Sequence, residues 1–490
     1  MPARPSSGDG LWLASMLAHW QTSSNKAKFT RGLVAAGLCV LAVSCGPAQL
    51  GASWPPLAKK WFERAQASFH VGDMDDAQLA SDNALRVDAK RPEIRLLAAR
   101  IALAQLEFDR AVQLTEGMTS SEAAATRGRA LWYGGHVSEA ADVLSKLVAD
   151  PEVRDPWAAD IAKIALRGAG RHPFTMSGGL LAVSEMPDTG RALLVPVELD
   201  GEPALAMIAT GVPETVVDAS AGAEPRWISL RFGERVEVKD IPALTKDLSG
   251  YSHQLNAPIK VLLGVNLLRH LRPTIDLLGG QFVVRTFDPP APPGASTVKV
   301  SYARGGGMLL RAAFGSGDTG TAVSLLVDTT MDFPLALDAG GWKKAGQSLA
   351  SLKPLPGNRA LSHGLVPLLS IGTFEIPQVP ALAGVPVDQI EKPIGMDLDG
   401  IIGSGLLAPF RMTLVDGGRT LWLEPTVTSA QAAAATGSEN EQLELSPPTE
   451  GSSFEGAAGD GIPTVPESPA PKKKLTPGTP RSPSGNPRPQ

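Results

Sequence analysis

The stretches ALAMIATGVPETVVDAS, at residues 204–220, and TAVSLLVDTTMDFPLALDAG, at residues 321–340, follow one plan. In each stretch an apolar run leads into a short loop, and a second apolar run leads out of it. Short apolar runs that are rich in β-branched residues and bounded by turn residues predict strands. The loops read Ala-Thr-Gly at 209–211 and Asp-Thr-Thr at 328–330. We therefore expect two β lobes, each containing a tight loop between two strands.

Each stretch is followed by a second matching segment. These segments read KVLLGVNLLRHLRPTIDLLGGQFVVR at residues 260–285 and DGIIGSGLLAPFRMTLVDGGRTLWLE at residues 399–424. Five positions match at one constant offset: Gly264, Leu267, Leu268, Arg272 and Thr274 against Gly403, Leu406, Leu407, Arg411 and Thr413. The constant offset indicates that the two halves are copies of one unit.

This order of elements resembles the aspartic proteases of the retropepsin and pepsin types. In that family an apolar strand delivers an Asp-Thr-Gly loop, and a later apolar-apolar-Gly strand packs beneath the loop. The resemblance implies an all-β, double-lobed, aspartic-protease-like fold, with lobe 1 at residues 174–290 and lobe 2 at residues 296–425. It also implies that Gly264 and Gly403 are the closing-strand glycines.

The first loop departs from the family's motif at its decisive position. Aspartic proteases hydrolyse peptides with two carboxylates that share one proton. The resemblance implies the site residues Asp328 (the candidate catalytic residue), Thr329 and Thr330, and a degenerate first motif made of Ala209, Thr210 and Gly211. Thr330 replaces the family's glycine, and we expect this β-branched residue to strain or shift the loop.

Two other segments spell the motif literally but lack an apolar strand before it. Asp188-Thr189-Gly190 follows Glu-Met-Pro, and Asp318-Thr319-Gly320 lies in a glycine-rich segment. Both are predicted to be turns. No glycine-rich flap segment stands out between residues 219 and 263, which also argues against an intact peptidase.

Residues 57–170 are rich in alanine and leucine, with apolar residues at helical spacing. Small or apolar residues recur there in three sets: Ala65, Gly72, Ala77 and Ala84; then, 34 residues later, Ala99, Leu106, Ala111 and Met118; then Gly128, Gly135, Ala140 and Leu147. A 34-residue period resembles the tetratricopeptide repeat, which implies an array of helical hairpins with a ligand groove.

The N-terminal 45 residues are predicted to be a secretory signal, because a basic stretch precedes an apolar run from Gly32 to Val43. The residues Ala-Val-Ser-Cys at 42–45 resemble a bacterial lipobox. This implies cleavage before Cys45 and lipidation of its thiol, so that the mature protein is anchored in a membrane without a spanning helix. An ordinary signal peptide and a short membrane anchor remain alternatives. Gly46 after the cysteine favours the outer membrane, facing the periplasm.

Composition excludes several partner classes and marks a tail. The net charge of −5 comes without a basic block in the folded regions, which argues against nucleic acid as a partner. The seven histidines are scattered and match no metal motif, and no cofactor motif is present, so we expect neither metal nor cofactor. Residues 426–490 hold few large apolar residues and many prolines, which predicts a disordered C-terminal tail.

The sequence thus predicts an α+β multidomain protein, with a helical repeat array before the β lobes, and leaves three functions open. The first is a membrane-anchored lipoprotein that binds or scaffolds a peptide or protein and has lost proteolysis. The second is an active aspartic endopeptidase that uses Asp328 with another carboxylate, from Asp188 or from a second chain. The third is a structural lipoprotein of the cell envelope. Loss of one member of a catalytic unit leaves only residual catalysis, which favours the first.

Overall fold

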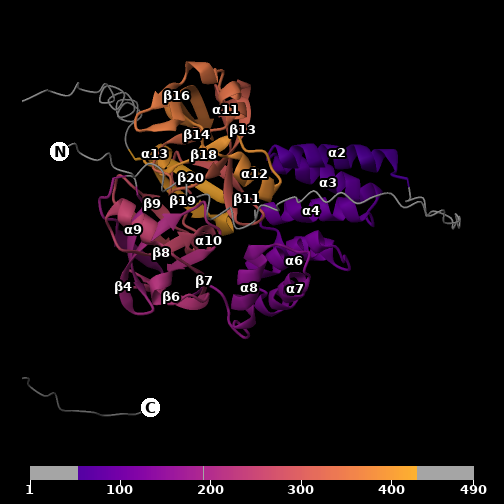
Figure 1. Ribbon diagram of the computed structural model, residues 1–490, viewed down its shortest axis with the longest axis horizontal. Helices are drawn as coiled ribbons and strands as arrows, with labels where there is room; N and C mark the ends of the chain where they lie inside the picture. The colour runs from indigo at the N-terminus through magenta and orange to yellow at the C-terminus, as the bar shows by residue number, and fades with distance from the viewer. Residues whose placement is uncertain (1–52, 191, 427–490) are drawn as a thin grey trace, which may run out of the picture. The chain divides into compact units, whose positions relative to one another are not determined.

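The computed structural model describes residues 53–190 and 192–426 (Figure 1). The predicted signal peptide with its lipobox cysteine, Cys45, lies outside the described residues, and so does the predicted tail from residue 427. Within the described ranges, no helix combines the length and the apolar character needed to cross a membrane.

The first part of the chain is helical. Its helices are α2 (Pro56–His70), α3 (Met74–Val87), α4 (Pro92–Ala104), α5 (Phe108–Thr115), α6 (Ser121–Tyr133), α7 (Val137–Ala149) and α8 (Pro156–Leu166). Proline occupies the first turn of α2, α4 and α8, where its missing N–H costs nothing. The side chains of Asp73, Ser120 and Asp155 accept hydrogen bonds from the first turns of α3, α6 and α8, as helix N-caps do.

Residues at equivalent positions in the three recurring sets have the same structural role. Residues 72, 106 and 135 lie in the turns within the pairs α2–α3, α4–α5 and α6–α7, with φ of 71°, 61° and 83°. Ala77, Ala111 and Ala140, five residues later, are fully buried where the second helix packs on the first. The helices therefore form successive hairpins, with one left-handed residue in each turn.

Lobe 1 is built mainly from strands. They are β1 (Thr175–Gly178), β2 (Leu181–Glu185), β3 (Leu194–Leu199), β4 (Glu202–Ala209), β5 (Thr215–Asp218), β6 (Arg226–Phe232), β7 (Val236–Lys246), β8 (Ile259–Gly264), β9 (Thr274–Asp276) and β10 (Gln281–Arg285). Helices α9 (Ser249–Leu255) and α10 (Val265–Leu271) flank β8. Strands β1 and β3–β8 form one sheet in the order β1-β7-β5-β8-β4-β3-β6.

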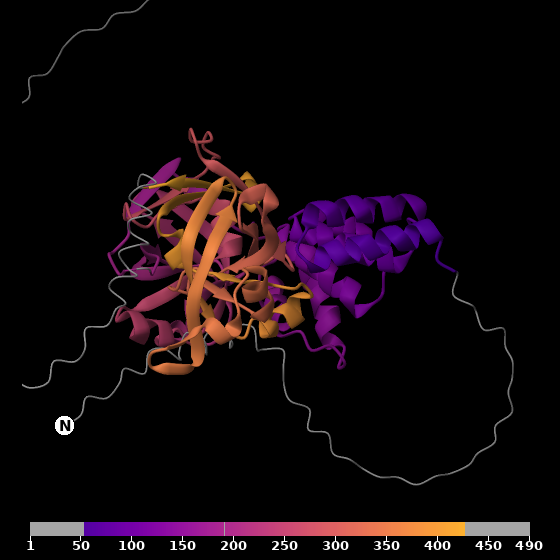
Figure 2. The same ribbon diagram turned by 90° about the horizontal axis from the view of Figure 1, so that it is seen from above.

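Lobe 2 repeats this plan. Its strands are β11 (Ser296–Ala303), β12 (Gly307–Phe314), β13 (Thr321–Val327), β14 (Leu335–Leu337), β15 (Lys353–Leu355), β16 (Asn358–Ile371), β17 (Phe374–Ala383), β18 (Gly400–Ile402), β19 (Phe410–Val415) and β20 (Thr420–Pro425). Its helices are α11 (Ala339–Lys344), α12 (Asp388–Ile394) and α13 (Ser404–Leu407). The long antiparallel pair β16–β17 is the orange hairpin in Figure 2.

The pairing of strands confirms that the lobes are duplicates. In lobe 1, β4 runs parallel to β8, and β8 pairs antiparallel with β5. In lobe 2, β13 runs parallel to β18, and β18 pairs antiparallel with β14. The lobes meet where β9 pairs antiparallel with β19. There Thr274 faces its sequence equivalent Thr413, with hydroxyl oxygens 2.8 Å apart, so a local two-fold axis passes between these residues.

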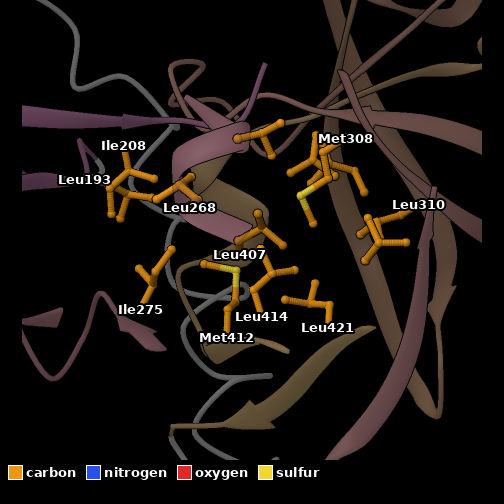
Figure 3. Packing of buried hydrophobic residues seen from close by; sticks show 14 of the residues in the cluster. Leu193, Ile208, Leu268, Ile275, Met308, Leu310, Leu407, Met412, Leu414 and Leu421 are labelled. Carbon is orange, nitrogen blue, oxygen red and sulfur yellow. The ribbon is translucent and has the colours of Figure 1, made fainter. Parts of the chain in front are cut away.

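One apolar core spans both lobes beneath the two loops. Leu268 of α10 and its equivalent Leu407 of α13 both belong to it, together with Ile208, Met308 and Leu414 (Figure 3). Because these side chains come from both copies, neither lobe buries this surface alone. The core therefore ties the lobes into one folding unit and places their loops side by side.

The helices pack on both lobes rather than standing apart. Residues of α4 and α6–α8 share a buried apolar cluster with lobe 1, and residues of α2–α4 share another with lobe 2. Hydrogen bonds cross these contacts: the Trp227 indole donates to the Ile164 carbonyl at 3.1 Å, and the Ser324 hydroxyl donates to the Val71 carbonyl at 2.7 Å. The helical array is thus attached to the β lobes by buried contacts.

Candidate functional site

The two loops are joined by a reciprocal pair of threonines. The Thr210 hydroxyl donates to the Val327 carbonyl at 2.9 Å, and the Thr329 hydroxyl donates to the Ile208 carbonyl at 2.8 Å. The backbone N–H of each threonine donates to the hydroxyl oxygen of the other, at 3.2 and 3.1 Å. Both side chains are buried. Each hydroxyl therefore supports the opposite loop, and the sequence-predicted residues Thr210 and Thr329 meet at the junction of the lobes.

Asp328 lies at this junction as a buried carboxyl group. Its side chain is 4 % exposed. Its Oδ1 atom accepts hydrogen bonds from the Thr330 backbone N–H at 3.0 Å and from the Thr330 hydroxyl at 2.7 Å. Burial raises the pKa of the Asp328 carboxyl, and the hydrogen bonds from Thr330 offset this rise in part. The carboxyl group is therefore biased toward its neutral form.

The position that should hold the partner carboxylate is apolar. Ala209 ends β4 and is fully buried. Gly211, two residues later, lies directly against the other loop: a Cβ atom on Gly211 would stand 2.5 Å from Asp328 Cγ. Glycine is required here because a methyl group would overlap the carboxyl group, not because of its backbone conformation. The structure thus brings one carboxyl group to the junction from these loops.

Thr330 does not strain the second loop, which corrects the expectation from the sequence. Its φ is negative, so a β-branched residue is accommodated without a left-handed conformation. Its hydroxyl instead donates to Asp328. The local two-fold places position 330 opposite position 209 in the way that Gly211 lies opposite Asp328. We infer that the threonine side chain fits because position 209 carries no carboxylate, so the two departures from the motif accompany each other.

The closing-strand glycines lie against the segments that follow the two loops. A Cβ on Gly264 would stand 2.1 Å from the Glu214 carbonyl, and one on Gly403 would stand 2.1 Å from the Phe333 carbonyl. The next residues repeat one hydrogen bond in both lobes: Val265 N–H donates to Val212 O at 2.9 Å, and Ser404 N–H donates to Met331 O at 2.7 Å. These glycines therefore set how closely each closing segment supports its loop.

The two literal copies of the motif lie elsewhere. Asp188 is exposed in the connection between β2 and β3, and its carboxylate accepts the Gly190 N–H at 3.3 Å. Gly317–Thr319 form a single 3₁₀ turn between β12 and β13. Both segments are turns, and the structure does not bring Asp188 together with the buried Asp328.

A second buried carboxyl group, which the sequence analysis missed, follows the first loop. Glu214 is 3 % exposed, and the Trp157 indole N–H of α8 donates to its Oε1 at 3.0 Å. Burial raises the pKa of the Glu214 carboxyl, and the bond from Trp157 lowers it in part. The sequence carried a signal for this group, because Glu214 is an acid within the apolar run that leads out of the first loop. A buried acid there needs a hydrogen-bond partner from another element, and the helical array supplies that partner.

The helices also cover the neighbourhood of the loops. Ala209 and Val212 belong to the buried cluster shared with α6–α8, and Met331 belongs to the cluster shared with α2–α4. Arg269 of α10 donates from Nη2 to the Tyr133 carbonyl of α6 at 2.9 Å. In a peptidase the reacting carboxylates face an open cleft that admits a peptide. Here Ala209, Val212 and Met331 are buried in apolar clusters that also contain helix residues.

The cavities near the loops differ sharply in size. A cavity of about 30 Å³ lies under the threonine pair and is apolar. Larger cavities of about 180 and 590 Å³ lie between the helices and the lobes. Among the described residues, no group of three His, Cys, Asp or Glu side chains is placed to hold a metal ion. Space for a ligand therefore exists at the boundary between helices and lobes.

Comparison with known proteins gives matches in structure alone. No protein-family model matches the chain, and none of the curated proteins matches it. A retropepsin-like aspartic protease from Rickettsia conorii matches with 19 % identity and a TM-score of 0.20, over 26 % of this chain and 89 % of that one. An aspartic proteinase from Irpex lacteus matches with 10 % identity and a TM-score of 0.32, over 51 % of this chain and 99 % of that one.

Proposed function

We propose that this protein is an envelope lipoprotein that binds or scaffolds a peptide or protein, built on an aspartic-protease-like fold that does not cleave peptides. The observation that carries this proposal is the buried Ala209 opposite Asp328. Peptide hydrolysis in this family needs one carboxylate as the base on water and a second carboxyl group to hold the proton. The described loops supply the Asp328 carboxyl group alone.

The chemistry of a single carboxyl group is insufficient for the reaction. One member of a catalytic unit, acting without its partner, gives only residual catalysis, because the members act together. Asp328 is also hydrogen-bonded within its own loop and shielded from solvent. The reciprocal hydrogen bonds of the threonine pair support a structural role for the loops.

Binding is assigned to the boundary between helices and lobes. Cavities of about 180 and 590 Å³ lie there, whereas the cavity under the threonine pair measures about 30 Å³. The hairpin array, which resembles tetratricopeptide repeats, adds a surface of the kind that receives peptides. A peptide therefore binds beside the loops at residues 209–211 and 328–330 rather than across them.

Anchoring in the membrane is the second part of the proposal. It rests on the basic stretch, the apolar run and the lipobox-like residues that end at Cys45. It is tested by labelling cells that express the full chain with a radioactive fatty acid. Label on the wild type and none on Cys45→Ser supports the anchor. Equal labelling of both proteins, or of neither, contradicts it.

Peptide binding is tested by affinity selection. The immobilised full chain is incubated at neutral pH with a library of peptides from a digested proteome, and bound peptides are eluted and sequenced. We expect a restricted set of intact peptides whose recovery is competed by the same peptides in solution. A recovered set that matches the input library in composition would contradict peptide binding.

The structure also offers an observation for each of two other functions. The retained Asp328, whose pKa burial raises, favours an aspartic endopeptidase completed by a second carboxylate. The covered loops favour a structural envelope lipoprotein, because an occluded site needs no ligand. Cleavage that depends on Asp328 would establish the first, and oligomers that form without any peptide would establish the second.

A further inference from the structure

A cavity between the helices and lobe 2 is lined by several charged residues. Its volume is about 590 Å³, within the range of roughly 300–1,000 Å³ that holds small ligands. It adjoins the cavity of about 180 Å³, and the two share Arg129 of α6, Asp155 at the start of α8, and Arg304 of lobe 2. These charged residues therefore lie where the two spaces meet, deep between three parts of the fold.

The shared wall holds two cations for one anion. Arg129 Nη2 lies 2.8 Å from Asp155 Oδ2, and Arg304 Nη2 lies 3.5 Å from the same oxygen. The other carboxylate oxygen, Asp155 Oδ1, accepts the Ala158 N–H of the helix. Arg304 therefore shares Asp155 Oδ2 with Arg129 at a longer distance, and its Nη1 atom donates to the Pro393 carbonyl at 3.0 Å. The three residues that both cavities share are thus two guanidinium groups and one carboxylate.

Arg304 is held in place against its backbone preference. It lies in the turn between β11 and β12 with φ of 51°, a left-handed conformation that glycine or asparagine adopts more easily. Its neighbour Gly305 packs against Leu103 and Tyr133 of the helical array. The surrounding contacts therefore fix the turn, and the guanidinium group is presented to the cavity at the cost of local strain. Strained residues of this kind gather at binding sites.

The two guanidinium groups of this wall act on each other. The charge of Arg129, and then burial, lower the pKa of Arg304 to about 10, so the two guanidinium groups repel each other more than Asp155 compensates. The acids that also line the cavity lie nearer solvent: Glu122 is largely exposed and pairs with Arg100 at 3.2 Å, and Glu152 is exposed. Arg100, Asp150 and the exposed Lys392 line the cavity as well, so its outer part carries charges of both signs, and Arg129 and Arg304 lie together beside Asp155.

We propose that this cavity binds the terminal carboxylate of a short peptide, with the carboxylate between Arg129 and Arg304. Guanidinium groups recognise carboxylates through two parallel N–H···O bonds, which fits a carboxylate placed in this wall. Leu103, Leu147 and Val153 line the same cavity and receive the apolar side chain of the last residue. This inference rests on the proposed function and names the chemistry of its ligand.

The test compares free C-termini with amidated ones. A pool of random seven-residue peptides with free C-termini and the same pool with C-terminal amides are each equilibrated with the full chain, and binding is measured by equilibrium dialysis with mass spectrometry. We expect free-acid peptides to bind at least about tenfold more tightly, a difference of roughly 1.4 kcal/mol. Arg304→Gln removes this preference, because it deletes one of the two cations.

A matched control separates the cavity from general charge effects. Arg419→Gln removes a surface arginine that pairs with Asp416 outside the cavity, and it leaves the preference unchanged. The thermal midpoint of Arg304→Gln is recorded to show that this variant is folded. If it is unfolded, the wild-type preference is measured with acetate as a competitor, which must weaken binding of the free acids and spare the amides.

The outcomes separate this inference from the proposed function. Equal binding of acids and amides, or a preference that survives Arg304→Gln, overturns the carboxylate site while leaving peptide binding intact. Absence of binding to either pool overturns both. A preference for free acids that Arg304→Gln abolishes and Arg419→Gln retains supports both.

Discussion

Replacing Thr329 with valine tests whether the threonine pair holds the two loops together. Valine has the same shape as threonine, so the substitution removes the hydroxyl and creates no cavity. The Ile208 carbonyl then loses the donor that lies 2.8 Å away, and the Thr210 N–H loses the acceptor that lies 3.2 Å away. Both groups are buried at the junction of the lobes.

The cost follows from the number of groups left without a partner. A buried donor or acceptor that loses its hydrogen bond costs about 1–3 kcal/mol. Two such groups give an expected loss of about 2–6 kcal/mol in the free energy of unfolding. The local two-fold predicts the same loss for Thr210→Val, which deprives the Val327 carbonyl and the Thr329 N–H of their partners. Thr329→Ser keeps the hydroxyl and loses one methyl group, which costs about 1 kcal/mol.

The assay is urea unfolding of the full-length protein at neutral pH, followed by tryptophan fluorescence, with all variants under the same conditions. We expect the wild type to have the highest urea midpoint and Thr329→Ser a lower one. The two valine variants should have the lowest midpoints, similar to each other. A valine variant that unfolds within about 0.5 kcal/mol of the wild type would refute the reasoning, because surface substitutions show changes of that size.

Three further predictions concern the same junction. Gly211→Ala places a methyl group 2.5 Å from Asp328 Cγ, so we expect a loss of about 1–3 kcal/mol by urea unfolding, which Asp328→Ala relieves; an unrelieved loss would contradict the contact. Ala209→Asp destabilises the protein by burying a second acid, and adding Thr330→Gly recovers part of the loss; strictly additive effects in a double-mutant cycle would show that the two positions do not interact. Burial raises the pKa of Asp328 in the folded protein above its value in the unfolded chain. The stability linked to this group is therefore present below the unfolded pKa and is lost as pH rises through the folded pKa, so the free energy of unfolding of Asp328→Asn rises relative to that of the wild type as pH increases. A difference in unfolding free energy that stays constant with pH would argue against a buried carboxyl group with a raised pKa.

The duplication was readable from the sequence because strand patterns and glycines repeat in register. The match of Thr274 with Thr413 at one offset predicted equivalent positions, and the structure places the two hydroxyl groups 2.8 Å apart on the two-fold axis. The turns at residues 72, 106 and 135 were marked by spacing, although Leu106 shows that the left-handed position does not always carry glycine. Such local patterns depend on residues close in the chain.

Contacts between distant segments were not readable in this way. Strain was expected at Thr330 because the family has glycine there, but what glycine provides in that loop is space beside a carboxyl group. Glu214 found its partner in Trp157, which lies 57 positions earlier in the chain, on a helix whose packing the sequence does not specify. The packing of the helical array against the lobes depends on many such contacts, and no single sequence motif predicts it.

The central claim is that the chain does not hydrolyse peptides, and sequencing of new peptide termini tests it most directly. The full chain and its Asp328→Asn variant are incubated with a library of denatured proteins from about pH 3 to about pH 8, the range in which catalytic carboxyl groups titrate. We predict that neither protein generates new termini above a buffer control at any pH. New termini produced by the wild type and abolished by Asp328→Asn would contradict the claim and identify Asp328 as a catalytic residue.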